Sequence, residues 1–298
     1  MRKIVNIAEQ SQKLALGTAQ FGLAYGLANA TGKVPSDTIE QLLKVASEFN
    51  ITMIDTAITY GDSEQVLGVH NLAKFEITSK LPAVPPGCLN VEEWIVEQTV
   101  SSLKRLRTDK LNDLLLHRPD QLLESNGEKI YKSMLRLKEQ GMVDKIGVSV
   151  YGPDELSELI KRFDFDVIQA PMNILDRRME NTGMLKQLKK TGVAIHIRSA
   201  FLQGLLLMPS EKIPVYFTPW ASLIKQYHHW LKQQGISPLQ ACLSYLNQYS
   251  DIDKIIVGVD SIWQLQQIAA AIDTPITDIP DCLQSVDEGL INPSRWQL

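Results

Sequence analysis

Eight short apolar runs alternate with longer amphipathic stretches along most of the 298 residues, and this alternation limits the possible folds more than any other feature. Strands that are separated by helices lie parallel in a sheet, because the chain crosses back over the sheet between them. Eight such units are enough to close the sheet into a barrel. We therefore expect an α/β protein with a (β/α)8 barrel, the TIM barrel fold.

Turn residues and helix caps set the boundaries of these units. The expected strands are residues 14–17, 52–56, 75–79, 113–116, 145–148, 167–169, 193–197 and 255–257. The expected helices are residues 36–49, 63–70, 91–106, 128–140, a segment after 152–154, 179–190 and 261–271. Gly141 and Gly192 follow two of these helices, where glycine commonly ends a helix.

Two segments fall outside the regular units. Residues 4–7 are β-prone and predict an N-terminal hairpin across the barrel floor. Residues 201–236, between strands seven and eight, form an unusually long connection rich in proline and aromatic residues. Long connections in compact domains are often functional, so we expect a loop that covers a ligand. No linker divides the chain, and we expect one domain over residues 1–298.

Composition favours a soluble enzyme without nucleic-acid or membrane partners. Hydrophobic residues make up 44%, charged residues 21%, and the net charge is −4, which provides no basic surface. The N-terminus lacks a secretory apolar region and no run is long enough to span a membrane, so we expect a cytoplasmic protein. The three cysteines and five histidines are not clustered, which predicts no metal site. A monomer is the default expectation.

Four polar residues stand at or just after the ends of neighbouring strands: Asp55, Tyr60, Lys80 and His117. Side chains at the carboxyl ends of barrel strands face the ligand site. A carboxylate, a phenol, an amine and an imidazole in one pocket suit proton transfer to a carbonyl oxygen. We expect the Lys80 ammonium to lower the pKa of Tyr60, and Asp55 to keep Lys80 charged.

These residues resemble the Asp, Tyr, Lys, His tetrad of the aldo-keto reductase family. The segment Gly17-Thr18-Ala19-Gln20-Phe21-Gly22 is similar to the one that opens that family's barrel, and the likeness covers nearly the whole chain. The resemblance implies that Tyr60 is the general acid or base and that Lys80 tunes it. It also implies that Asp55 holds Lys80 and that His117 orients the substrate carbonyl.

The same resemblance implies an extended nicotinamide nucleotide across the barrel mouth. The implied cofactor contacts are Thr18, Ser149, Gln169, Arg198, Ser199, Phe201, Leu202, Gln203, Gly204, Gly258, Asp260, Ser261 and Gln264. Ser149 and Gln169 would hold the carboxamide, the segment from Ser199 to Gly204 would wrap the pyrophosphate, and the residues after strand eight would lie near the adenosine.

The chain departs from the family pattern in three places. Val150 replaces a common Asn, and Arg198 stands where many members stack a Tyr on the nicotinamide. The segment 257–265 after strand eight lacks the Lys or Arg that usually binds the 2′-phosphate of NADP. Asp260 in this segment would repel that phosphate if it lies beside it, and an acidic residue near the ribose normally favours the 2′-hydroxyl of NAD. We expect NADP, with NAD possible, because the resemblance implies it for most members of the family and because Arg177, Arg178 or Lys225 could bring a cation to the phosphate. Asp260 is alternatively an N-cap for the following helix.

The resemblance implies an oxidoreductase that reduces an aldehyde, a ketone or a sugar carbonyl. A sugar carbonyl is included because the motifs look like those of bacterial members associated with sugar or polysaccharide metabolism. Arg118 directly follows His117 and either meets an anionic or polyhydroxylated substrate or forms a surface salt bridge. Two alternatives stay open. One is a cofactor-binding regulatory barrel without net turnover, and the other is a redox-neutral enzyme that modifies sugars.

Overall fold

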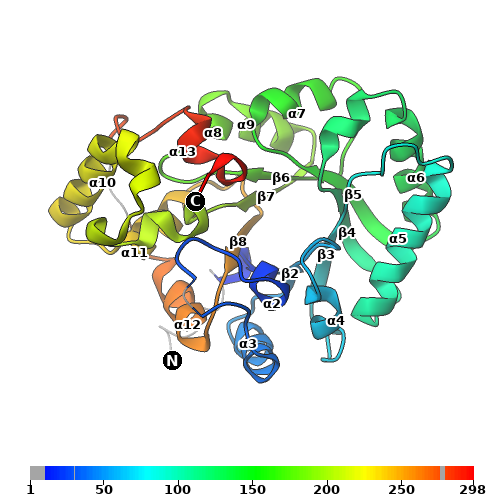
Figure 1. The fold of residues 1–298 in the computed structure, drawn as a ribbon, viewed down its shortest axis with the longest axis horizontal. Helices are drawn as coiled ribbons and strands as arrows, with labels where there is room; N and C mark the ends of the chain where they lie inside the picture. Colours follow the sequence, from blue (N-terminus) through cyan, green and yellow to red (C-terminus); the bar gives the residue numbers. More distant parts are fainter. Residues whose placement is uncertain (1–10, 30, 276–278) are drawn as a thin grey trace.

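The computed structural model describes residues 11–29, 31–275 and 279–298. Eight parallel strands close into one barrel in chain order, with helices around it (Figure 1). The strands are β1 (Leu14–Gly17), β2 (Met53–Asp55), β3 (Glu76–Leu81), β4 (Leu111–Leu116), β5 (Val143–Ser149), β6 (Val167–Pro171), β7 (Ala194–Arg198) and β8 (Lys254–Gly258). The predicted barrel is confirmed, and each expected strand agrees with the observed one to within two residues at either end. The hairpin expected at residues 4–7 lies outside the described residues.

The helices of the expected units form most of the outer layer. They are α3 (Ser36–Glu48), α4 (Ser63–Leu67), α5 (Val91–Leu106), α6 (Gly127–Glu139), α7 (Pro153–Leu159), α8 (Arg178–Asn181), α9 (Met184–Lys190) and α12 (Ile262–Ala271). The single helix expected over residues 179–190 is wrong, because Gly183 takes a left-handed conformation with φ 72° and separates α8 from α9.

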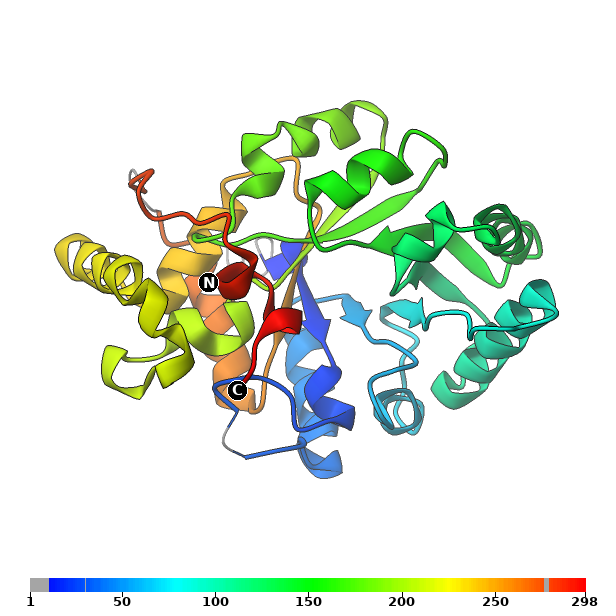
Figure 2. The ribbon, with the colours of Figure 1, turned by 45° about the horizontal axis from the view of Figure 1, so that its top comes forward.

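Four further helices were not expected. Two are single turns, α2 (Ala19–Gly22) after β1 and α13 (Glu288–Ile291) near the C-terminus. The other two are α10 (Ala221–Gln234) and α11 (Pro238–Asn247), which lie between β7 and β8, so the long connection is only partly a loop. Ser237 starts α11 with a capping box in which its side chain and that of Gln240 bond each other's backbone N–H. In Figures 1 and 2, α10 lies at the outer left edge of the molecule.

The apolar core lies mainly between the barrel and the helices, while much of the barrel interior is polar. In β1, Leu14 and Leu16 belong to the main core, whereas Ala15 packs in a separate small cluster with Met53 and Ile256. Because successive side chains of a strand point to opposite faces, Ala15 and Gly17 face the interior. The polar side chains Thr78, Lys80, Asp113, Gln169 and His196 are all buried. No helix in the described part of the chain is both long and apolar enough to cross a membrane.

Candidate active site

Two glycines place Tyr60 by letting the loops after β1 and β2 touch. A Cβ atom at Gly22 would overlap the carbonyl oxygen of Tyr60, and one at Gly61 would overlap the carbonyl oxygen of Gly22. Gly61 also has a φ of +57°, which a side chain disfavours. The Ser63 hydroxyl donates to the carbonyl oxygen of Thr18 at 2.9 Å and ties the same two loops together. The motif Gly17 to Gly22 and the dipeptide Tyr60-Gly61 thus act as one unit.

Lys80 and Asp55 form a buried ion pair beneath the Tyr60 hydroxyl. The side chain of Lys80 is 0% exposed, and its Nζ lies 2.6 Å from Asp55 Oδ1 and 2.8 Å from the carbonyl oxygen of Thr56. The same Nζ is 3.5 Å from the Tyr60 hydroxyl oxygen. Gln169 Nε2 donates to the other Asp55 oxygen, Oδ2, at 2.7 Å. Both oxygens of the buried carboxylate are therefore bonded, which offsets the cost of removing it from water.

His117 completes the group on the next strand along. Its ring meets the Tyr60 ring edge to face, with centroids 5.8 Å apart. Its Nδ1 lies 3.1 Å from the hydroxyl oxygen of Thr59. If Thr59 donates this bond, the imidazole proton sits on Nε2, which is then the donor nitrogen. The four residues singled out by sequence therefore meet in one place, from three consecutive strands and the loop between two of them.

The pKa shifts in this group follow mainly from burial. Burial raises the pKa of Tyr60 above its ordinary value, and the Asp55 charge raises it further. Our expectation of a lowered Tyr60 pKa is wrong, because the effect of burial outweighs that of the Arg198 charge, which lowers the pKa. Burial also lowers the pKa of Lys80, against the opposing effect of Asp55. Burial, with the charges of Lys80, Arg198 and Arg118, lowers the pKa of His117 to about 3. At neutral pH, Tyr60 is a protonated phenol and His117 a neutral imidazole.

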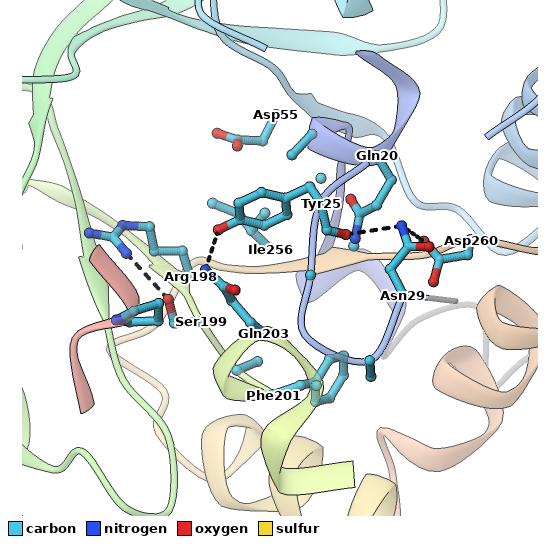
Figure 3. A pocket seen from close by; sticks show the side chains of 18 of the residues that line it. Gln20, Tyr25, Asn29, Asp55, Arg198, Ser199, Phe201, Gln203, Ile256 and Asp260 are labelled. Atoms are coloured by element: carbon cyan, nitrogen blue, oxygen red, sulfur yellow. Dashed lines mark hydrogen bonds between the residues drawn. The ribbon is translucent and has the colours of Figure 1, made fainter. Parts of the chain in front are cut away.

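A cavity of about 830 Å³ opens beside these residues (Figure 3). Asp55, Tyr60 and His117 line it, and Lys80 lies behind Asp55. Eleven of the expected cofactor residues also line it: Thr18, Ser149, Gln169, Arg198, Ser199, Phe201, Gln203, Gly204, Gly258, Asp260 and Gln264. The other two are not in the wall. Leu202 is fully buried in the apolar core, and Ser261 is the N-cap of α12, where its hydroxyl accepts from Gln264 N.

Three loops touch one another across this cavity. The Tyr25 hydroxyl lies 3.2 Å from Gln203 Nε2, and the Ala28 backbone N–H donates to the Gln203 carbonyl oxygen at 3.4 Å. Asn29 Nδ2 donates to Asp260 Oδ1 at 3.4 Å. The segment after α2 therefore bridges the loops that follow β7 and β8, as Figure 3 shows. Part of the long connection between β7 and β8, around Phe201 and Gln203, lines the cavity.

Positive charge in the cavity is confined to one end. Among the described residues that line it, Arg198 is the only Lys or Arg. Arg177, Arg178 and Lys225 do not line the cavity. Arg178 is bonded to Asp176 and to the Tyr151 carbonyl oxygen instead. Arg118, also outside the wall, forms the surface salt bridge with Asp120. The described residues contain no group of His, Cys, Asp and Glu arranged to hold a metal ion.

Several cavity residues were not singled out as site residues from the sequence. Thr59 bonds His117 and immediately precedes Tyr60, so its place in the sequence could have identified it as a site residue. Trp263 lines the rim and is 67% exposed, which is unusual for a large aromatic side chain. Pro293 and Ser294 reach the cavity from the C-terminal tail, and no local pattern indicates this. Tyr25 and Tyr151 are also in the wall.

Known proteins share both the sequence pattern and this architecture. The aldo/keto reductase family model matches residues 13–280. The chain is 23% identical to the oxidoreductase sirO of Leptosphaeria maculans, over 87% of this chain and 88% of that protein. It is 26% identical to the aldo-keto reductase YhdN of Bacillus subtilis (strain 168), over 68% of this chain and 62% of that protein. An NADH-specific methylglyoxal reductase of Escherichia coli (strain K12) is 26% identical over 62% of this chain and 61% of its own length.

The fold comparison points the same way. The aldo-keto reductase AKR11C1 of Bacillus halodurans superposes with a TM-score of 0.71 at 22% identity, covering 89% of this chain and 88% of that one. This likeness concerns the barrel, while the family model covers the strand ends that carry the candidate residues. The chain belongs to the aldo-keto reductase family and is an oxidoreductase that reduces carbonyl compounds.

Proposed function

We propose that this enzyme reduces an aldehyde, a ketone or a sugar carbonyl and that Tyr60 donates the proton to the carbonyl oxygen. The observation that carries the proposal is the assembly of Asp55, Tyr60, Lys80 and His117 at one end of a single cavity. When bound, a reduced nicotinamide supplies the hydride. Negative charge then develops on the carbonyl oxygen, and a proton donor within hydrogen-bond reach lowers the barrier.

Each of the four side chains has a distinct role in this proposal. Tyr60 is protonated at neutral pH, because burial raises the pKa of its phenol, so it can act as an acid. Lys80 Nζ, 3.5 Å from the phenol oxygen, stabilises the phenolate that remains after transfer. Asp55 keeps Lys80 charged in spite of burial. Neutral His117 donates a second hydrogen bond to the substrate oxygen from Nε2, while Thr59 bonds Nδ1.

The cavity wall fits an extended nicotinamide nucleotide. Ser149 and Gln169, bonded to each other at 3.1 Å, present a hydroxyl and an amide that would hold the carboxamide. The backbone from Ser199 to Gly204 repeatedly takes positive φ values, which brings its main chain into the wall, where backbone N–H groups would hold the pyrophosphate. Gly258, Asp260 and Gln264 lie at the other end, for the adenosine. We also propose that residues 1–298 form one domain. The family model matches residues 13–280, and Ser294, beyond that range, lines the same cavity, which supports this proposal.

We further propose that NADH is preferred to NADPH. The expectation of NADP rested on the habit of the family and on a cation supplied by Arg177, Arg178 or Lys225, and none of these three residues lines the cavity. Asp260 lies in the wall, and a carboxylate beside the ribose repels a 2′-phosphate but accepts a hydrogen bond from a 2′-hydroxyl. The NADH-specific name of one E. coli relative agrees with this preference.

The first test is Tyr60→Phe, with 4-nitrobenzaldehyde as substrate. We expect kcat to fall at least roughly 100-fold, since general acid catalysis commonly contributes 10²- to 10⁴-fold. Binding of NADH, followed by quenching of the five tryptophans, should change less than about twofold, because the phenol does not hold the nucleotide. Tyr131→Phe is the matched control, since the Tyr131 hydroxyl bonds Asp164 outside the cavity. Unchanged kcat in Tyr60→Phe would refute the role of Tyr60.

A redox-neutral enzyme would consume a substrate without net oxidation of NADH, and a regulatory barrel would bind NADH without consuming any aldehyde. Both alternatives are thereby separated from the proposal in the same assay. The four residues lie together, and both carboxylate oxygens of Asp55 are bonded, which argues against a regulatory barrel without catalytic activity.

A further inference from the structure

Arg198 is a cation that lines the cavity without an acidic partner. It ends β7, and its guanidinium donates from NH2 to the Val150 carbonyl oxygen at 2.9 Å and from NH1 to the Ser199 hydroxyl at 3.2 Å. Among the ion pairs of the described residues, none includes Arg198. The nearby Glu155 carboxylate accepts from the Tyr151 backbone N–H instead. The guanidinium of Arg198 is therefore held in place without a carboxylate of the described residues in ion-pair contact.

The guanidinium is also held in one orientation. It lies over the Tyr151 ring, 4.9 Å from the ring centroid, while its bond to Val150 draws it towards the end of β5. Figure 3 shows it directed away from Phe201 and Gln203, in the loop that we assign to the pyrophosphate. It lies close enough to the catalytic end to lower the pKa values of both Tyr60 and His117, though in each case burial has the larger effect. The free charge thus faces the place where the carbonyl must react.

Such a group is suited to binding an oxyanion. A guanidinium has five N–H donors in a planar fork, and with the described residues it makes only two bonds, both to neutral oxygens. The remaining donors can bind a carboxylate or a phosphate through two parallel hydrogen bonds. Charges that are partly withdrawn from water are normally paired, so an unpaired one in a cavity wall calls for an anionic ligand.

We propose that Arg198 binds a carboxylate or phosphate group carried by the substrate itself, close to the carbonyl that is reduced. The inference rests on the proposed function, because it takes the end of the cavity beside Tyr60 as the place of the carbonyl. It narrows the substrate class to anionic aldehydes and ketones. Arg118 has no such role, because it pairs with Asp120 outside the cavity wall.

The test compares matched anionic and neutral substrates with wild type, Arg198→Met and the control Arg118→Met. The pairs are 4-carboxybenzaldehyde with 4-nitrobenzaldehyde, and glyceraldehyde 3-phosphate with glyceraldehyde, all at saturating NADH. In Arg198→Met we expect kcat/KM for the preferred anionic substrate to fall roughly 10- to 100-fold more than kcat/KM for its neutral partner. The pair that responds identifies carboxylate or phosphate as the natural group. Arg118→Met should match wild type on all four.

Two results would overturn the anion site while leaving the proposed function intact. One is an equal loss for anionic and neutral substrates. The other is a tenfold weaker binding of NADH in Arg198→Met, which would assign the guanidinium to the cofactor. If no aldehyde is reduced at all, the proposed function fails, and the anion site is then judged by binding of benzoate and phenyl phosphate. Binding of either that disappears in Arg198→Met sustains the site, and binding that is absent or unaffected refutes it.

Discussion

Asp113 gives a stability prediction whose size follows from the structure. It lies on β4 inside the barrel with 0% exposure, and the Thr78 hydroxyl donates to its Oδ2 at 2.7 Å. Its other oxygen, Oδ1, has no partner among the described residues, and neither has Nδ1 of the facing His196, which is 3.9 Å from Oδ2. A carboxylate in this position is poorly solvated. We predict that Asp113→Asn stabilises the protein at neutral pH.

The magnitude comes from the shifted pKa. Burial raises the pKa of Asp113 from 3.8 to about 6, against the lowering effect of the Thr78 bond. Between these values the folded state holds a proton that the unfolded state has lost, so stability falls as pH rises from 3.8 through about 6. A shift of this size corresponds to roughly 3 kcal/mol, and we expect the neutral amide to recover about 1–3 kcal/mol of it above pH 7.

The assay is urea unfolding of wild type and Asp113→Asn at pH 4, 5, 6, 7 and 8. The two proteins should be nearly equal at pH 4, where Asp113 is protonated when folded, and should diverge as pH rises. Burial lowers the pKa of His196 from 6.5 to about 3, so only the unfolded state is protonated between these values and both proteins gain stability as pH rises through this range. This slope is common to wild type and variant and cancels in the difference between them. Asp109→Asn, in an exposed turn, is the control and should differ from wild type by less than about 0.5 kcal/mol at every pH. A difference that is constant with pH, or a destabilised variant at pH 8, would refute the reasoning.

Two further predictions concern the active site. Gly22→Ala should lower kcat at least roughly tenfold with little change in NADH affinity. The reason is that the new Cβ overlaps the Tyr60 carbonyl oxygen and so displaces the proposed proton donor. Unchanged kcat would show that the loop adjusts without moving Tyr60. Asp260→Ser should improve binding of NADPH relative to NADH by roughly fivefold, about 1 kcal/mol for one repulsive charge near the surface, as read by tryptophan quenching. An unchanged ratio would place the 2′-phosphate away from Asp260.

The barrel and the tetrad were predictable because both depend on local sequence. Each strand is a short apolar run with turn residues on both sides, and the polar residue that ends it must face the mouth. The segments 14–17 and 91–106 agree at both ends with β1 and α5. The local pattern therefore suffices to place Asp55, Lys80 and His117 on or directly after neighbouring strands. Tyr60 follows Asp55 by five positions, which places it in the loop after β2.

Side-chain direction and long-range contacts were not predictable in the same way. The sequence places Arg198 at a strand end, but its bond to Val150 joins residues far apart in the chain and fixes where the charge lies. The sequence did not predict α10, because the proline and aromatic residues that precede it are typical of a loop. The sign of the Tyr60 pKa shift also depends on how completely the ring is buried, which no local pattern gives.

Two buried carboxylates near the site show how a structural ion pair differs from a functional one. Glu64 is saturated, since Oε1 accepts from Ser79 and Ser102 and Oε2 pairs with Arg105. It joins α4, α5 and β3 and does not line the cavity.

Asp55 is saturated too, but it lines the cavity, and its partner Lys80 approaches the hydroxyl of a protonated phenol. Replacing a buried ion pair with apolar residues of similar volume is often neutral or stabilising. Stability alone therefore gives little reason to bury Lys80 against Asp55. In the mechanism that we propose, the charge stabilises the phenolate that forms when Tyr60 releases its proton, and this role would account for an ammonium that is completely withdrawn from water.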